Sequence, residues 1–205
     1  TMPDKSSPLL FIIPDSREGW VASVRLLIES YTKGGAWFSF DYDTIRPEGS
    51  PIRGFGGTAS GPEPLKQLHK RIESYLDAYC HGKIDQTRTV ADIMNAIGIC
   101  VVAGNVRRSA GIIRGSVEDL TFIELKDYKK NPDRAEIGWV SNNTVVLHKS
   151  EEFKKLPIIA SHIRDNGEPG IMNLINVQKY ARYGDESEDK AWLANPCSEI
   201  PLESF

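Results

Sequence analysis

The segment LLFIIPDSREGW, residues 9–20, sets the fold class at the beginning of the chain. Residues 9–14 are wholly apolar, as in a short buried strand. Asp15 and Ser16 are residue types that cap the N-terminus of a helix, and Glu18 places an acidic side chain in the first turn. The segment therefore predicts a buried strand, a turn and a helix in immediate succession.

The expected helix carries apolar residues at roughly helical spacing and ends at Gly34 and Gly35. Residues 36–42 then alternate aromatic and small side chains, which favours a second strand. A strand, a helix and a strand in this order are typical of a parallel α/β unit. We therefore predict an α/β fold.

Further helices and strands follow in the rest of the chain. We predict helices over residues 64–79, 89–102, 119–130, 150–166 and 174–183, and strands over 111–113, 144–147 and 170–173. Thr89 and Ser150 are the expected N-caps of two of these helices. Residues 46–64 are rich in Gly, Pro and Ser, and a long loop of this kind usually binds something. Residues 184–190 read as a charged linker.

The composition is that of a soluble globular protein, and its 205 residues suit one domain or a large piece of one. A net charge of −3 argues against a surface dedicated to nucleic acid. Three scattered cysteines exclude a secreted disulfide framework, and no apolar stretch approaches the roughly 18 residues of a membrane span. The histidines lack metal-ligand spacing, so we assign no metal. We expect a cytoplasmic protein with no membrane or nucleic-acid partner.

The motif NPCSEIPL, residues 195–202, is the most informative for chemistry. In an extended backbone alternate residues point to the same side, so Asn195, Cys197 and Glu199 are expected to converge on one bound molecule. A neighbouring carboxylate raises the pKa of a thiol and disfavours a thiolate nucleophile. The pair instead suits a thiol that exchanges a hydrogen atom while the carboxylate accepts a proton from a hydroxyl. The alternative is a buried cysteine in a proline-rich turn beside a solvated glutamate.

This motif resembles the finger-loop signature of the large, catalytic chain of ribonucleotide reductases. The resemblance implies that Cys197 becomes a thiyl radical and abstracts the ribose 3′ hydrogen. It implies that Glu199 deprotonates the 3′-hydroxyl and that Asn195 binds and orients the sugar hydroxyls. Ser198 stands where glycine is common in the family.

Two earlier segments resemble the parts of this family that bind the specificity effector, a deoxynucleoside triphosphate. Asp15 and Ser16 precede a helix start, where anionic groups are favoured, and a plain N-cap is the alternative. The segment IRPEGSPIRG, residues 45–54, resembles the first effector loop. Its Arg46 and Arg53 suit phosphate oxygens, with solvated surface arginines as the alternative.

The segment GNVRRSA, residues 104–110, resembles the second effector loop, which links the effector to the base accepted at the catalytic site. Arg107 and Arg108 are the expected contacts to effector or substrate, and the alternative is that they cap the preceding helix. Asn142 and Asn143 also follow family patterns near the substrate. Their alternative role is to satisfy a turn.

The segments FGGTASGPEPL, residues 55–65, and DIMNAIG, residues 92–98, are most similar to the adenosylcobalamin-dependent (class II) branch, in particular its triphosphate reductases. This resemblance implies adenosylcobalamin as the cofactor, with its contacts outside this chain. The radical chemistry then belongs to the cofactor, and the protein supplies position and shielding. The implied partners are a ribonucleoside di- or triphosphate substrate, a deoxynucleoside triphosphate effector, an external thiol reductant such as thioredoxin, and the remainder of the reductase chain.

The family fold is a ten-stranded α/β barrel made of two five-stranded parallel halves with outer helices. The resemblance implies that residues 1–205 form part of this catalytic barrel domain, with the first half, the effector loops and the start of the finger loop. The family's substrate-reducing cysteine pair has no counterpart here, because Cys80 and Cys100 do not occupy matching positions. We therefore expect the isolated chain to be inactive, either as an expressed fragment or as part of a split enzyme. The alternative function is a nucleotide-binding or assembly module with no activity of its own.

Overall fold

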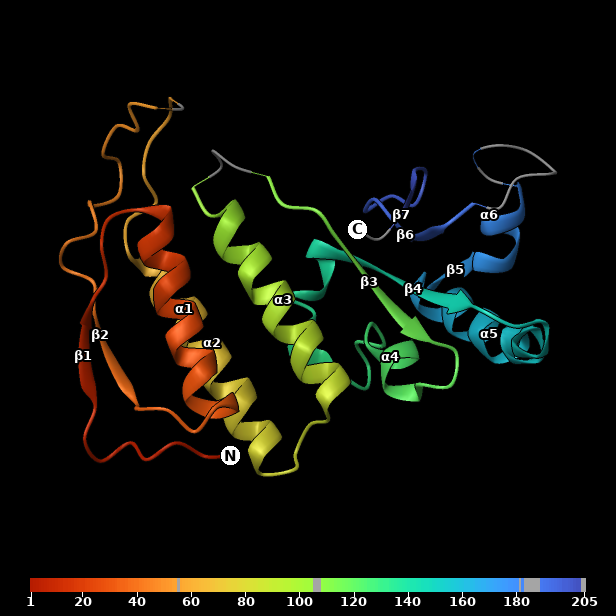
Figure 1. Cartoon of the computed structure of the whole chain (residues 1–205), viewed down its shortest axis with the longest axis horizontal. Coiled ribbons are helices and arrows are strands. Elements are labelled where there is room, and N and C mark those ends of the chain that lie inside the picture. Colours follow the sequence, from red (N-terminus) through yellow and green to blue (C-terminus); the bar gives the residue numbers. More distant parts are fainter. Residues whose placement is uncertain (55, 105–107, 181, 183–188, 204–205) are drawn as a thin grey trace. The chain divides into compact units, whose positions relative to one another are not determined.

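In a computed structural model the chain forms two compact units, unit 1 (Thr1–Ser109) and unit 2 (Ala110–Phe205), which are described separately (Figure 1). The structure describes residues 1–54, 56–104, 108–180, 182 and 189–203. Each unit combines helices with parallel strands, which confirms the α/β class. Within the described residues, no helix is both long and apolar enough to cross a membrane.

Unit 1 confirms the order strand, helix, strand at its start, but the first strand is not buried as predicted, because Leu9, Leu10 and Ile12 are exposed. Its elements are β1 (Leu9–Ile12), α1 (Arg17–Thr32), β2 (Phe38–Asp41), α2 (Glu63–Cys80) and α3 (Gln86–Val102). β1 and β2 pair in parallel, with Leu9 opposite Phe38. Ser16 is the N-cap of α1, because its Oγ accepts a hydrogen bond from the Gly19 N–H at 3.0 Å.

The expected N-cap of α3 at Thr89 is wrong. The cap is Asp85, whose side chain accepts from the Arg88 N–H at 2.8 Å. Thr89 lies inside the helix, where its hydroxyl donates back to the Asp85 carbonyl at 2.6 Å. Threonine and aspartate both suit a cap, so composition alone did not separate them.

The core of unit 1 lies between the two strands and the helices. Ile13 is fully buried directly after β1, and Ile45 is buried shortly after β2. The other buried members of this core are Leu27, Tyr31, Leu65, Leu68, Ile72, Leu76 and Ala96. A two-stranded sheet is marginal alone, so this packing, at about 1.5–3 kcal/mol for each fully buried aliphatic side chain, holds β1 and β2 in place.

A buried polar relay fixes the end of β2 against the helices. The Tyr42 hydroxyl lies 2.7 Å from His69 Nδ1, and Ser23 Oγ lies 3.0 Å from His69 Nε2. Because Ser23 uses its own proton on the Trp20 carbonyl, Nε2 must donate to Ser23, and Nδ1 accepts from Tyr42. Burial lowers the pKa of His69 to about 4, so the ring is neutral.

Unit 2 is built on a three-stranded parallel sheet. Its strands are β3 (Gly111–Ser116), β4 (Ser141–Leu147) and β5 (Gly170–Asn173), with β4 in the middle. Its helices are α4 (Leu120–Glu124), α5 (Leu156–Asn166) and α6 (Leu174–Tyr180). An antiparallel hairpin, β6 (Ala191–Ala194) and β7 (Pro201–Glu203), ends the described part.

Two predicted helices of unit 2 have wrong bounds. The helix expected over 119–130 ends at Glu124, because the Asp127 side chain accepts from the Lys129 N–H at 3.1 Å and forms a turn instead. The helix expected from Ser150 starts at Leu156 with Lys155 at its N-cap position, and Ser150 instead begins a 3₁₀ segment over Ser150–Lys155. Pro157 suits the first turn of a helix and not its interior.

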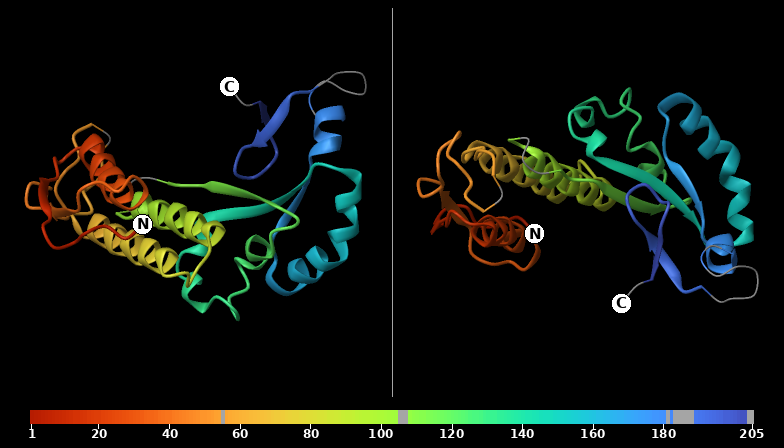
Figure 2. Two further views of the ribbon diagram at one scale, coloured as in Figure 1. Left: turned by 60° about the horizontal axis from the view of Figure 1, so that its bottom comes forward. Right: turned by 90° about the horizontal axis from the view of Figure 1, so that it is seen from above.

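The two faces of the sheet in unit 2 carry different partners. Gly115 lies against the Phe122 ring of α4, where any added Cβ would come within 2.2 Å of that ring. Gly115 pairs with Val145, so α4 covers the face to which Val145 points. In Figure 2 the hairpin and α5 lie on opposite sides of this sheet.

The described strands do not form the five-stranded parallel sheet that we expected for a half-barrel. Two parallel strands belong to unit 1 and three to unit 2, while β6 and β7 are antiparallel. The strands of unit 1 are joined to their own helices by a separate core, which accounts for the division.

Candidate functional site

The loop that carries Asn195, Cys197 and Glu199 is a closed turn between β6 and β7, so the extended backbone expected there is wrong. The Ser198 N–H donates to the Asn195 carbonyl at 2.8 Å, and the Asn195 N–H donates to the Ile200 carbonyl at 3.2 Å. The Asn195 side chain adds a third bond, since its Oδ1 accepts from the Ile200 N–H at 2.9 Å. The three candidate residues therefore share one turn and not one face of a strand.

Ser198 has a φ of +64°, the one positive value among the described non-glycine residues. This left-handed conformation favours glycine, which is the residue common at this position in the resembling family. Cys197 and Glu199 are both exposed, so the alternative of a buried cysteine is wrong.

The hairpin formed by β6 and β7 lies along β4 on one face of the sheet. The rings of His148 and Trp192 lie 5.1 Å apart, and Val146 packs in one cluster with Ala194. Further along, the Asn142 amide Nδ2 donates to the Pro196 carbonyl at 2.8 Å. β6 therefore runs antiparallel to β4. The start of β4 lies near the turn of the hairpin, and the end of β4 lies near the start of β6.

Arg114 of β3 supports this arrangement by donating to the Trp192 carbonyl. It pairs with Thr144 in the sheet, so Arg114 and Asn142 project from the same face. Sequence reasoning missed Arg114, because nothing in the local sequence indicates a contact across 78 residues.

The base of the hairpin is held by an ion cluster that sequence reasoning also missed. Arg182 contacts both carboxylate oxygens of the buried Asp189 and lies 2.6 Å from Glu203 of β7. Asp189 in turn accepts from the Ala191 N–H at 2.8 Å, at the start of β6. The bond from Arg182 and the Ala191 N–H lower the pKa of Asp189, so its carboxylate is charged at neutral pH. Charged residues in a polar segment gave no signal of this pairing.

Asn142 and Asn143 both lie in β4, so the turn role is wrong for each. Asn142 is exposed and contacts the turn between β6 and β7 through the Pro196 carbonyl. Asn143 is buried, and its backbone N–H donates to Glu168 Oε2 at 2.9 Å. Glu168 forms an ion pair with Lys126 at 2.7 Å, so Asn143 belongs to a structural network.

The structure brings together two of the predicted effector residues. Arg46 Nε lies 2.6 Å from Asp15 Oδ2, and both side chains are partly exposed. Asp15 follows β1 and precedes the α1 N-cap, while Arg46 follows the buried Ile45 after β2. The carboxyl ends of two parallel strands therefore place a carboxylate and a guanidinium beside one helix start.

The expected loop over residues 46–64 contains its own short ladder. The Gly49 N–H donates to the Ala59 carbonyl at 2.9 Å, and Pro51 forms an antiparallel bridge with Thr58. Arg53 is exposed near the tip of this ladder, and the structure shows no contact that brings it to Asp15. The segment is thus an ordered projection and not an irregular loop.

The start of the second predicted effector loop, at Gly104, lies against Ser60, which follows the first predicted loop. A Cβ added to Gly104, which has a φ of +83°, would lie 3.1 Å from Ser60 Cβ, so glycine permits this approach. Arg108 is exposed. Arg107, the other predicted contact of the second loop, lies outside the described residues.

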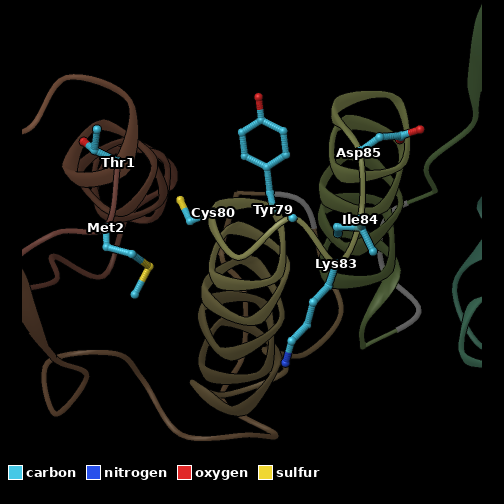
Figure 3. Close-up of a pocket in the computed structure, with 8 residues that line it drawn as sticks. Thr1, Met2, Tyr79, Cys80, Lys83, Ile84 and Asp85 are labelled. Carbon is cyan, nitrogen blue, oxygen red and sulfur yellow. The ribbon is translucent and has the colours of Figure 1, made fainter.

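A surface hollow of about 600 Å³ lies elsewhere in unit 1, between the N-terminal residues and the end of α2, and Cys80 lines it (Figure 3). Its lining residue Thr1 donates to the carbonyl of Tyr31 in the last turn of α1, whereas Asp15 precedes the first turn. The 16 residues of α1 therefore separate this hollow from Asp15 by about 24 Å.

Comparison with known proteins identifies similar chains. Residues 2–76 match the family model described as the insertion domain of B12-dependent ribonucleotide reductase. The chain is 44% identical over 200 residues to the probable adenosylcobalamin-dependent ribonucleoside-triphosphate reductase of Dictyostelium discoideum, which covers 96% of this chain and 26% of that protein. It is 41% identical over 207 residues to the adenosylcobalamin-dependent ribonucleoside-triphosphate reductase of Euglena gracilis, covering 99% of this chain and 28% of that protein.

A solved structure described as a crystal structure of B12-dependent (class II) ribonucleotide reductase matches with a TM-score of 0.77 and 35% identity, covering 96% of this chain and 28% of that chain. The resemblance predicted from the motifs is confirmed along nearly the whole chain. The chain spans about a quarter of the length of these relatives.

Proposed function

We propose that this chain is a segment of an adenosylcobalamin-dependent ribonucleotide reductase and that residues 1–205 are part of its catalytic barrel domain. The observation that carries the proposal is the turn between β6 and β7, which holds Asn195, Cys197 and Glu199 together against β4. The substrate is a ribonucleoside di- or triphosphate, and the product is the corresponding 2′-deoxyribonucleotide.

In this proposal Cys197 acts as a thiyl radical that takes the 3′ hydrogen atom of the ribose. Glu199 takes the proton of the 3′-hydroxyl, for which an exposed carboxylate on the same turn is suited. The Oδ1 atom of Asn195 is bound to the Ile200 N–H, so the amide meets a sugar hydroxyl as a donor through Nδ2. Electrons come from a cysteine pair elsewhere in the reductase and then from an external thiol reductant such as thioredoxin.

Adenosylcobalamin is named for the relatives, and we extend it to the complete protein. Adenosylcobalamin carries its cobalt chelated by its own ring, so a protein must supply a large cavity for it and not a cluster of metal-binding side chains. The hollow beside Cys80, of about 600 Å³, is too small for a molecule of this size. In this proposal the contacts of the cofactor therefore lie outside the described residues.

The effector site of the proposal lies at Asp15 and Arg46. Asp15 accepts a hydrogen bond from a ribose hydroxyl, and Arg46 binds a phosphate of the deoxynucleoside triphosphate beside the start of α1. The ion pair between them is partly exposed and contributes at most about 1 kcal/mol, so a charged ligand can replace it at little cost. Arg53, Arg107 and Arg108 are proposed as further contacts to the effector or the substrate on the family resemblance alone.

The test uses the intact polypeptide that contains this segment. Cys197→Ser and Glu199→Gln should each lower ribonucleotide reduction at least 10³-fold, because each removes a group that reacts in the proposed mechanism. Binding of a deoxynucleoside triphosphate, measured by calorimetry, should be unchanged in both variants. Retained reduction in either variant would refute the assigned role.

A second candidate is a nucleotide-binding module with no chemistry of its own. One observation favours it: Asp15 and Arg46 belong to unit 1, which has its own core and none of the three residues of the catalytic turn. The isolated chain should then bind a deoxynucleoside triphosphate, and Asp15→Ala or Arg46→Ala should weaken binding about tenfold or more. An unchanged affinity in both variants would exclude this site.

A further inference from the structure

Resting on the proposed function, we propose that Asn142 is a positioning residue for the catalytic turn. Its side-chain amide fixes the peptide unit between Pro196 and Cys197, and this fixes the place of the reacting sulfur. The sequence motif alone suggested a ligand contact for Asn142, but the structure assigns its amide to the turn.

The first step of the argument is the identity of the accepting atom. Asn142 Nδ2 donates at 2.8 Å to the Pro196 carbonyl, and that carbonyl shares a peptide unit with the nitrogen of Cys197. A peptide unit is planar, so a bond that holds its oxygen also restricts the nitrogen and Cα of the next residue. Asn142 therefore acts one peptide unit away from the sulfur-bearing residue.

The second step is the difference between shaping the turn and locating it. The bonds among Asn195, Ser198 and Ile200 join residues of the turn to each other, so they set its shape. They do not tie the turn to the sheet. The bond from Asn142 reaches the turn from β4, a separate and central strand of that sheet.

The third step is that Asn142 itself stands on a fixed backbone. The carbonyl before it, at Ser141, accepts from Lys126 Nζ at 2.5 Å, and the N–H after it, at Asn143, donates to Glu168 at 2.9 Å. Lys126 and Glu168 are paired with each other at 2.7 Å. A side chain on a strand locked on both sides can hold a catalytic group more accurately than one on a loop.

This role predicts a particular kinetic signature. A group that only positions the sulfur should affect turnover, because a displacement of about 1 Å can cost about 10²-fold in rate. A group that contacts the substrate equally in ground and transition states should affect KM instead. The two roles of Asn142 therefore separate in kcat and KM.

The experiment uses the intact reductase polypeptide with Asn142→Ala and Asn142→Asp. The aspartate has nearly the shape of asparagine but presents an acceptor to the Pro196 carbonyl and cannot donate when ionised. Gln67→Ala is the control, because it removes an exposed side-chain amide hydrogen bond to Glu63 within α2 of unit 1. We measure kcat, KM and, without substrate, hydrogen exchange of the peptide that covers residues 195–200.

Both Asn142 variants should lower kcat 10- to 100-fold, leave KM within twofold and speed exchange of the Ser198 and Ile200 amides at least threefold. Gln67→Ala should change none of these. A raised KM with unchanged exchange would overturn the proposal in favour of a ligand contact, and no change in either quantity would also overturn it. If the proposed function itself is wrong, the unaltered polypeptide will show no reduction, and the exchange data alone will decide whether Asn142 holds the turn.

Discussion

Asp15 and Arg46 follow strands β1 and β2 of unit 1, and a buried isoleucine lies between each strand and the candidate residue. Cys197, in contrast, lies in a turn that ends at an exposed isoleucine. Ile13 and Ile45, which precede the two effector residues, are 0% and 6% exposed. Ile200, beside the catalytic turn, is 53% exposed. Asp15 and Arg46 are therefore placed next to a hydrophobic core, whereas the turn between β6 and β7 is placed by polar contacts together with the packing of Ala194 against Val146.

Both regions leave apolar side chains exposed, but only one has a core next to the candidate residues. A core of packed side chains lies beside Asp15 and Arg46, although β1 leaves Leu9, Leu10 and Ile12 exposed. The hairpin leaves Trp192, Leu193 and Leu202 exposed and is held by bonds from Asn142, Arg114 and Arg182. We expect unit 1 to keep the pair of Asp15 and Arg46 in the isolated chain, and we expect the turn between β6 and β7 to be the less stable of the two regions.

The largest effect that would test the comparison comes from the core behind Asp15. Ile13→Ala should destabilise unit 1 by roughly 2–5 kcal/mol, because it leaves a cavity at a fully buried position. Ile200→Ala, at the exposed position beside the turn, should cost less than about 0.5 kcal/mol. Urea denaturation of both variants measures these values, and equal losses would break the comparison.

Acid should destabilise unit 1 through His69. Burial lowers the pKa of this residue to about 4, below the unfolded value of 6.5, so the unfolded state binds the extra proton. Its contribution is fully present above about pH 6.5 and is lost as the pH falls, by about 3 kcal/mol at pH 4.

His69→Gln should flatten this part of the pH dependence, since an amide does not titrate in this range. Urea denaturation of the original chain and of the variant at pH 7.5 and 4.5 gives the difference. The same slope in both proteins would show that other groups, and not His69, carry the acid sensitivity.

A smaller effect is expected for a substitution that stabilises the turn between β6 and β7. Ser198→Gly should stabilise the catalytic turn by about 1 kcal/mol, because glycine adopts a φ of +64° without the cost that a Cβ brings. Exchange of the Ile200 amide should slow about fivefold, as measured by mass spectrometry of the turn peptide. Faster exchange would mean that the extra backbone freedom of glycine in the open turn outweighs the relief of the backbone strain at Ser198.

The smallest effect concerns the ion pair of the effector site. Arg46→Ala should change the free energy of unfolding by less than about 1 kcal/mol, because the pair with Asp15 is partly exposed. A double-mutant cycle with Asp15→Ala, at low and high salt, measures the coupling. A coupling of several kcal/mol would mean that the pair supports the fold and is not held ready for a ligand.

Local signals predicted the parts of the fold that depend on neighbouring residues. The apolar run after Leu9, the cap at Ser16 and the parallel pairing of β1 and β2 all followed from short-range patterns. The bounds of α4 could not be predicted in this way, because the turn at Asp127 competes with the helix for the same backbone groups.

Sequence patterns identified the residues of the candidate site but did not predict how they are arranged. The motif around Cys197 was found by resemblance, but the alternation argument assumed a strand where the chain turns. The local clue was Ser198, at a position where glycine is common and φ is positive. The bonds from Asn142 to Pro196 and from Arg114 to Trp192 join residues 54 and 78 positions apart, and single-sequence patterns do not encode such pairs.

The contacts between β4 and the hairpin also limit how this segment can change in length. Asn142, Val146 and His148 are separated by even numbers of residues, so all three side chains point to one side of the pleat. Deleting one residue between Asn142 and His148 would shorten the strand by about 3.3 Å and turn one end of the series to the opposite face. We therefore expect natural variants of this strand to differ in side chains and not in residue count.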